Sequence, residues 1–101
     1  MPEICMKLTH TQGEILLAAA DSDLINREFK SDKLKIAVMD SFYGENRVNE
    51  ETFISSLGLC TIANLVGKHT IDIAIREGLV DSENVLMIGG VPHAQIAKIL
   101  D

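Results

Sequence analysis

Residues 14–20 constrain the fold more strongly than any other stretch, because they are apolar on both faces of a strand. A strand with no polar face is buried on both sides, so it lies in the interior of a sheet. Residues 4–9 alternate with the period of two that is typical of a strand, and Thr11, Gln12 and Gly13 provide a turn between the two segments. The sequence therefore predicts an N-terminal hairpin whose second strand is central in the sheet.

Two further strands are indicated downstream of the hairpin. Residues 33–40 alternate as a strand does, and residues 85–88 form a short, fully apolar run. A polar turn at residues 21–23 is placed to cap one or two helical turns over residues 24–29. Residues 41–46 carry turn-forming side chains. These segments predict short strands and a short helical segment, joined by short polar turns.

Two helices are predicted in the middle of the chain. Asn49 is followed by two glutamates, which indicates a helix start, because a capping side chain and early carboxylates stabilise the free N–H groups there. Gly58 is placed to end this helix. Residues 60–77 follow a helical stripe and predict a second, buried helix. Gly67 would then mark a kink or a close packing contact inside it, and Gly78 would follow its end.

The C-terminal residues 93–100 allow two interpretations. They form either a helix with Pro92 at its first position or a short strand. The order of strands and helices predicts an α+β (mixed α/β) fold. We expect a single small domain over residues 1–101, with a sheet of about four strands, the N-terminal hairpin and helices mainly on one face.

The composition excludes several classes of protein. The chain has 101 residues, of which 47% are hydrophobic, which is enough apolar surface for a self-sufficient core and excludes a disordered chain. Fifteen acidic and nine basic residues give a net charge of −6, which repels phosphate backbones, so nucleic acid is not expected as the sole partner. No apolar run approaches the roughly 18 residues of a membrane span. The N-terminal residues lack the pattern of a signal peptide, and we expect a cytoplasmic protein.

The cysteines and histidines do not form a recognisable metal site. Cys5 and Cys60 are far apart and have no C-x-x-C spacing, which excludes a zinc ribbon. Two buried free thiols are expected instead. The sequence has neither the H-E-x-x-H pattern of a metalloprotease nor the G-x-S-x-G pattern of a serine hydrolase. We therefore assign no metal, no cofactor and no catalytic residue from the sequence.

Gly89 and Gly90 form the strongest candidate binding segment, together with His93 and Gln95. Two glycines at the end of a buried strand let the backbone turn tightly and expose N–H groups that can hold an anion. His93 adds a group that titrates near neutral pH, and Gln95 adds a polar side chain. The alternative is an ordinary turn followed by a surface histidine.

Tyr43 and Asn64 are the other candidate ligand-binding residues. Tyr43 is the only tyrosine and follows a predicted strand, where a ligand could stack on its ring or bond to its hydroxyl. The alternative is an aromatic side chain that covers the core. Asn64 is an amide within an apolar stretch, so if buried it must be hydrogen-bonded. Its partner is either a ligand or protein interface, or a neighbouring loop.

Four of the nine basic residues lie within nine positions of one another: Arg27, Lys30, Lys33 and Lys35. Such a group can contact phosphates although the whole chain is acidic. It is sparse, is interrupted by two acidic residues and has no aromatic interleaving, so a solvated face or protection of an edge strand by lysines is the favoured explanation.

Three of these segments together resemble a known family. They are residues 42–44, residues 61–67 and residues 88–95, with the sequences FYG, TIANLVG and IGGVPHAQ. The chain resembles an archaeal family of small proteins of unknown function, number 424 in its series, over nearly its whole length. Glu45 departs from the second glycine expected after Gly44, which weighs against an anion-holding loop there. The resemblance implies no established activity, but it implies an association with genes of translation.

Three functional interpretations remain open. The first is a non-enzymatic binding or accessory module, linked to translation or RNA metabolism, whose partner is a protein with a basic face. Tyr43, Asn64, His93 and Gln95 would then line one surface.

The second interpretation is a small enzyme, or a nucleotide- or anion-binding protein, in which Gly89 and Gly90 hold the anion and His93 transfers a proton. The third is a homo-oligomer in which the same motifs serve only the fold and the interface.

Overall fold

The N-terminal hairpin is present as predicted. In a computed structural model that describes residues 3–44 and 46–98, strand β1 (Ile4–Thr11) pairs antiparallel with β2 (Glu14–Asp21) along its whole length. The turn between them places Gln12 and Gly13 at φ 47° and 81°, and glycine reaches such positive angles at no steric cost.

The main sheet has six strands in the order β5-β1-β2-β6-β8-β7, two more than expected. Strand β2 lies between β1 and β6, which confirms the prediction that it is central. It pairs parallel with β6, whereas β6 pairs antiparallel with β8. The remaining strands of this sheet are β5 (Asn46–Val48), β6 (Ile62–Val66), β7 (Leu86–Ile88) and β8 (Val91–Ala97).

The second predicted helix, over residues 60–77, is wrong over residues 60–67. Residues 62–66 form β6, and only α3 (Lys68–Arg76) is helical. A short apolar run buried on both sides satisfies the helical stripe and the strand pattern equally well, so periodicity alone does not separate them. Gly67 is therefore the junction between strand and helix and not a kink.

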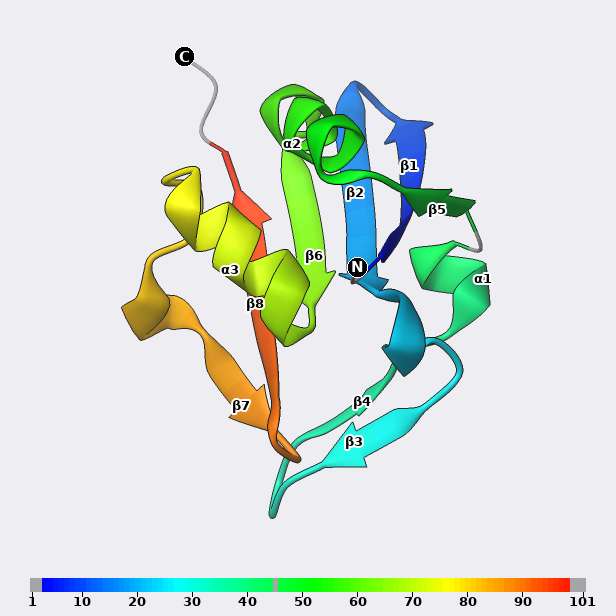
Figure 1. The fold of residues 1–101 in the computed structure, drawn as a ribbon. Coiled ribbons are helices and arrows are strands. Elements are labelled where there is room, and N and C mark those ends of the chain that lie inside the picture. The colour runs from blue at the N-terminus through cyan, green and yellow to red at the C-terminus, as the bar shows by residue number, and fades with distance from the viewer. Residues whose placement is uncertain (1–2, 45, 99–101) are drawn as a thin grey trace.

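Helices α2 (Glu50–Leu59) and α3 lie over the same side of the sheet, which faces the viewer in Figure 1. Asn49 begins α2 as predicted, because its side chain accepts a hydrogen bond from the Thr52 N–H at 2.8 Å. The helix continues through Gly58 to Leu59 instead of ending at the glycine. The larger core cluster fills the space between these helices and the sheet; it includes Leu17, Phe53, Leu57, Leu65 and Ile73.

The opposite side of the sheet is covered only in part. A single helical turn, α1 (Asp40–Tyr43), and a two-stranded sheet of β3 (Glu28–Lys30) and β4 (Lys35–Ala37) cover it. They enclose a second, smaller core cluster that includes Ala18, Ala20, Val38, Tyr43 and Val66. The expectation of helices mainly on one face is met by α2 and α3.

Two local predictions on this side need correction. Residues 24–29 do not form helical turns: a 3-10 helix, η1 (Ser22–Leu24), is followed by β3. The strand predicted over residues 33–40 is only the three residues of β4, and the chain becomes helical at Asp40. The strands β3 and β4 pair only with each other, over three residues each, and local alternation does not show where this pairing ends.

The C-terminal segment is a strand and not a helix, as far as the structure describes it. Pro92 lies within β8 opposite Met87, and β8 extends to Ala97. Cys5 and Cys60 are buried free thiols, as expected. A second 3-10 helix, η2 (Ser82–Asn84), connects α3 to β7. Within residues 3–44 and 46–98, no helix has the length and apolarity needed to cross a membrane.

Candidate functional site

One open hollow of the described surface lies where the carboxyl ends of β2 and β6 meet. Ligand sites in sheets with parallel strands favour this position, because the backbone leaves the sheet there. Asp21 ends β2, and Gly67 follows β6. The hollow has a volume of about 600 Å³, and its lining carries four carboxylates and one lysine: Glu3, Asp21, Asp23, Asp72 and Lys68, with His69 and Ser22 beside them.

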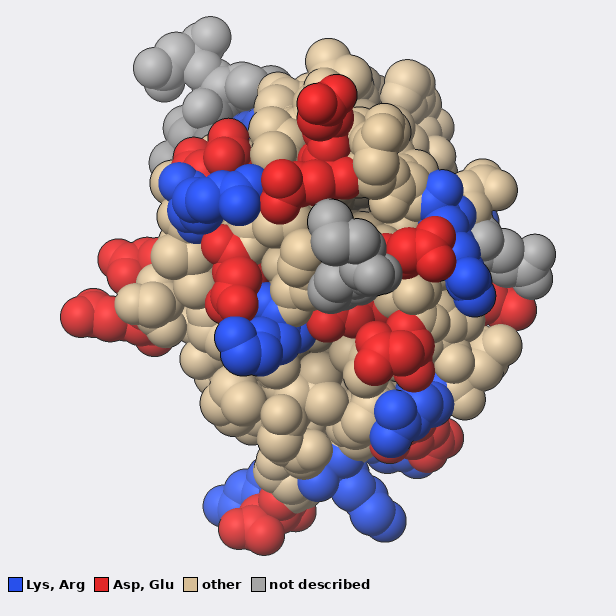
Figure 2. Space-filling view, in the orientation of Figure 1, with Lys and Arg blue, Asp and Glu red and all other residues tan. Residues whose placement is uncertain are grey.

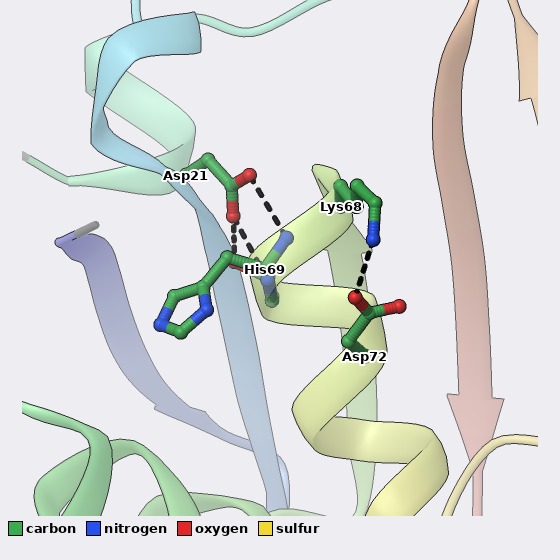
Figure 3. Close-up of polar contacts among 5 residues, drawn as sticks. Asp21, Lys68, His69 and Asp72 are labelled. Atoms are coloured by element: carbon green, nitrogen blue, oxygen red, sulfur yellow. Dashed lines mark hydrogen bonds and ion pairs between the residues drawn. The ribbon is translucent and has the colours of Figure 1, made fainter. Parts of the chain in front are cut away.

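Asp21 caps the beginning of α3 from a distant part of the chain. One carboxylate oxygen accepts hydrogen bonds from the Thr70 N–H at 2.8 Å and the Thr70 hydroxyl at 2.7 Å, and the other accepts from the His69 N–H at 3.1 Å. Figure 3 shows this carboxylate against the first turn of the helix. A negative charge at this end also stabilises the helix dipole. The chain's own carboxylate therefore occupies the position that an anionic ligand would take.

Gly67 makes this contact with Asp21 geometrically possible. Its φ of 109° belongs to a region that side-chain-bearing residues rarely adopt. A Cβ at this position would meet the carboxyl carbon of Asp21 at a sterically forbidden separation. The glycine thus lets the strand turn sharply into α3 and lets the carboxylate approach the helix.

The charges around the hollow are partly paired. Lys68 bonds to Asp72 at 2.8 Å, one helical turn further along α3, as Figure 3 shows. Arg47 pairs with Glu3 at 3.3 Å. The His69 ring points away from the helix in Figure 3, so only its backbone N–H takes part in the cap. Asp21 and Asp23 carry no paired cation among the described residues, so the hollow has a surplus of negative charge and suits a cationic group.

Asn64, His93 and Gln95 lie together on the other side of the sheet, the side opposite α2 and α3. Asn64 on β6 is directly opposite Gln95 on β8, and the Gln95 Nε2 donates to the Asn64 Oδ1 at 2.8 Å. His93 is opposite Val66, one row further along the same side. The carbonyl oxygen of the Asn64 amide thus has a side-chain partner, which is neither the ligand or interface nor the loop expected from the sequence.

His93 is half-buried. Burial lowers the pKa of its imidazole, because the charged form loses water there. Its Nδ1 is buried and has no hydrogen-bond partner among the described residues. An imidazole that is hard to protonate is a poor general acid at neutral pH, whereas its neutral form can still accept a proton.

Tyr43 is removed from any open site. Its side chain is 3% exposed and belongs to the smaller core cluster. Burial raises the pKa of its hydroxyl to about 12. The ring of its neighbour Phe42 stands against it edge-on at 4.9 Å between centroids. The interpretation of Tyr43 as a core-covering aromatic therefore describes its position, and the exposed ring of this segment is Phe42.

Gly89 and Gly90 form the tight turn between β7 and β8, and one of the two amides is already engaged. The Gly89 N–H donates to the Ser31 hydroxyl at 2.7 Å. A Cβ on Gly89 would lie 2.8 Å from the Lys30 backbone nitrogen. This glycine therefore lets the turn pack against the small β3-β4 sheet, and its N–H is not free to hold an anion.

The four clustered cations lie on the small sheet and beside it. Lys35 pairs with Glu28 across this sheet at 3.3 Å, and the Arg27 guanidinium lies 5.1 Å from the centre of the Phe29 ring. Lys30 and Lys33 are exposed. The position of Glu45, which weighed against an anion-holding loop, lies outside the described residues.

The hollow beside Asp21 was not predicted from the sequence, because the roles of Asp21 and Gly67 were inferred only from their neighbours along the chain. Asp21 was expected to cap the residues that follow it, but it makes no side-chain bond to η1 and caps α3 instead. The glycine in Val66-Gly67-Lys68 was assigned to a helix interior. An apolar strand ending in aspartate and a second one ending in glycine would have been the signal for this site.

Three comparisons with known proteins describe the family and the fold. A family model described as "Protein of unknown function (DUF424)" matches residues 9–99. A crystal structure of an uncharacterized conserved protein from Methanopyrus kandleri is similar in fold, with a TM-score of 0.74 and 18% sequence identity, and the similarity covers 98% of this chain and 96% of that chain. No curated protein matches the chain.

Proposed function

The chain belongs to the DUF424 family of proteins of unknown function. From the charge and shape of its surface, we propose that it is a non-enzymatic binding module for a protein with a basic face. The proposed contact is the acidic hollow beside α3. The partner would belong to the translation machinery, with which the family resemblance associates the chain.

The observation that carries this proposal is the charge distribution on the side covered by α2 and α3. Arg47, Lys68 and Arg76 on this side each bond to a carboxylate. Carboxylates remain in excess, and Figure 2 shows several separate acidic patches on this side, with basic groups beside some of them. Such exposed pairs contribute little to stability, but they cancel the local positive charge. A basic partner surface therefore meets a net negative field here, which steers association.

The hollow offers a specific place for a cationic side chain of the partner. Its volume of about 600 Å³ accommodates more than one side chain. Asp23 and Asp72 are exposed at its rim, and a lysine or arginine entering the hollow would lie within reach of both. Asp21 contributes its charge while remaining bonded to α3. No step of this role requires a reaction, because charge and shape supply the recognition.

Ribosomal particles are the first partners to test, since their proteins present basic faces. Co-sedimentation of the protein with purified ribosomal subunits is expected at low salt and is expected to decrease as salt screens the contact. The double variant D23N/D72N should co-sediment clearly less than the wild type. The control variant D32N/E83Q makes the same change in net charge at exposed positions outside the hollow.

Equal co-sedimentation of both double variants would contradict the proposal, as would the absence of any co-sedimentation at low salt. Sedimentation of the protein alone in the same buffers tests the homo-oligomer interpretation. The anion-binding interpretation is not favoured, because the Gly89 N–H already bonds to Ser31.

A further inference from the structure

We propose that the side of the sheet opposite α2 and α3 binds single-stranded nucleic acid, with one base held beside Phe42. This surface differs from the acidic hollow, so the inference is independent of the proposed function. It rests on three features that lie together: a small pocket with an aromatic wall, a pair of bonded amides, and cations that are not paired with carboxylates.

The pocket is of the size of one ring system. It has a volume of about 160 Å³ and lies between α1 and the strands β1, β2 and β6. A cavity of about 150 Å³ accommodates a benzene ring in another protein, so this one admits a base entering from the open side. Its floor contains the small side chain of Ala18 beside Leu16, and its rim carries Lys7 and Asn64.

Phe42 provides the stacking surface of the pocket. Its side chain is 49% exposed, yet it is held in place because its ring stands against the buried ring of Tyr43. Bases stack on such aromatic faces regardless of their sequence, with a gain of about 1–3 kcal/mol per base. An exposed but fixed ring loses little freedom on binding, which favours this use.

The pair Asn64 and Gln95 offers hydrogen bonds to the edge of a base. Because the Gln95 Nε2 donates to the Asn64 Oδ1, the Asn64 Nδ2 and the Gln95 Oε1 remain for a ligand. If both amides were reversed, the pair would still present one donor and one acceptor. Adjacent donors and acceptors of this kind are what amide side chains use to recognise base edges. A row across the sheet runs from Lys7 through Ala18 to these two residues.

The charge on this side favours a polyanion over a peptide. Lys7 lies at the rim of the pocket, where its Nζ bonds to the Ser41 carbonyl oxygen. On and beside the small sheet, Arg27, Lys30 and Lys33 make no ion pair with any carboxylate in the part of the chain that the structure describes.

The small sheet packs on the same side as the pocket, because Phe29 and Ile36 contact the smaller core cluster. Two described carboxylates also lie near the pocket: Glu14 bonds to the Thr61 hydroxyl, and Asp40 lies close to the Asn26 amide. A strand with one base beside Phe42 and its phosphates near Lys7 would continue towards the cations of the small sheet. The net charge of −6 opposes the approach of a polyanion at long range, so this binding depends on the local cations and is weakened by salt.

The test measures binding of a fluorescent oligoribonucleotide of about eight nucleotides, a length within the usual site size of such surfaces. Fluorescence anisotropy should show binding at about 50 mM salt and a large loss of affinity at about 200 mM. Removing the aromatic face in F42L should weaken binding about tenfold, the loss expected for one stacked base. K7Q should reduce the slope of log affinity against log salt by about 0.7, the value for one phosphate contact.

Controls separate loss of contact from loss of fold. F42L keeps an apolar side chain against Tyr43. L59A removes an apolar residue on the other side of the sheet that is 63% exposed, against 49% for Phe42; L59A should bind as the wild type does. Thermal unfolding of each variant verifies the fold. The inference is overturned if the oligonucleotide does not bind at low salt, or if F42L and L59A bind equally. If a mononucleotide binds as tightly as the oligonucleotide, the cations of the small sheet add nothing to the affinity, and their proposed contact with the phosphates is overturned.

Discussion

The carboxylate of Asp21 and the Thr70 side chain are joined directly, with 2.7 Å between the Asp21 Oδ1 and the Thr70 hydroxyl. The two residues are 49 positions apart in sequence. Because the same oxygen also accepts from the Thr70 N–H, this contact fixes the end of β2 to the beginning of α3. The contact also determines the shape of the acidic hollow. Because it joins two elements of the fold, its removal should lower the free energy of unfolding of the whole domain.

Replacing Asp21 by alanine should lower the free energy of unfolding by about 1–3 kcal/mol. Three donors at the beginning of α3 lose their acceptor, and helix caps and bonds to charged acceptors contribute about this much. Urea unfolding followed by circular dichroism measures the change. Asp23→Ala is the control, because the Asp23 carboxylate makes no hydrogen bond with the described residues; a similar loss in both variants would contradict the capping role.

Replacing Gly67 by alanine should destabilise the domain by at least about 2 kcal/mol. The backbone at this position has φ 109°, which alone costs about 1–3 kcal/mol for a residue with a Cβ, and the Cβ would collide with the Asp21 carboxyl group. Gly58→Ala is the matched comparison. Gly58 lies in α2 with no atom near its Cβ position, so alanine should stabilise that helix by about 0.5–1 kcal/mol. Urea unfolding should show a lower free energy of unfolding for Gly67→Ala and a higher one for Gly58→Ala than for the wild type.

His93 should make the domain less stable in mild acid. Burial lowers the pKa of its imidazole below the ordinary value of 6.5, so below pH 6.5 the unfolded chain binds a proton that the folded chain binds less readily. The stability that neutral His93 contributes is therefore complete above pH 6.5 and is lost as pH falls from there through the lower pKa of the folded state.

The pH dependence is measured by urea unfolding at several pH values on both sides of 6.5. His93→Gln should flatten the decrease on the acid side, whereas His10→Gln, at an exposed position of β1, should leave it in place. An unchanged pH profile in His93→Gln would show that another group causes the decrease.

Tyr43 should ionise unusually late. Burial raises the pKa of its hydroxyl to about 12 from 10, so the folded state holds this proton where the unfolded chain has lost it. Its contribution to stability is present below pH 10 and is lost as pH rises towards 12. Since it is the only tyrosine, the absorbance of tyrosinate reports this residue alone.

The alkaline titration should have a midpoint near 12 in buffer and near 10 in denaturant. Circular dichroism recorded in parallel follows the fold. A midpoint near 10 in the folded protein would place the ring in water and contradict its burial in the smaller core cluster.

Alternation alone was not a reliable signal, because only Lys35–Ala37 of the alternating residues 33–40 form a strand. The hairpin of β1 and β2, the start of α2 at Asn49 and the short apolar strand before Gly89 were predicted correctly, because turn or capping residues bound each of them locally. β6 has no such signal, because a short apolar run between two strands resembles a turn of buried helix. Because residues 62–66 were predicted as part of a helix, fewer strands were expected than the sheet contains.

The positions of the candidate site residues also depend on tertiary contacts that local signals do not show. Asn64, His93 and Gln95 are brought together on one side of the sheet by the pairing of β6 with β8, a pairing that required β6 to be recognised as a strand. Tyr43 is buried and leaves Phe42 exposed in its place. Their role in binding stays a prediction.

The sequence by itself determined that residues 14–20 lie inside a sheet, because a strand without a polar face has no stable position at an edge. It also determined the net charge of −6 and a hydrophobic content sufficient for a folded core. Only the tertiary structure decided that Asp21 caps α3, since the bond joins residues 49 positions apart and depends on β2 and β6 running parallel. Local propensity acts over a few residues, whereas the two surfaces proposed here for binding arise from contacts between segments that the sequence keeps far apart.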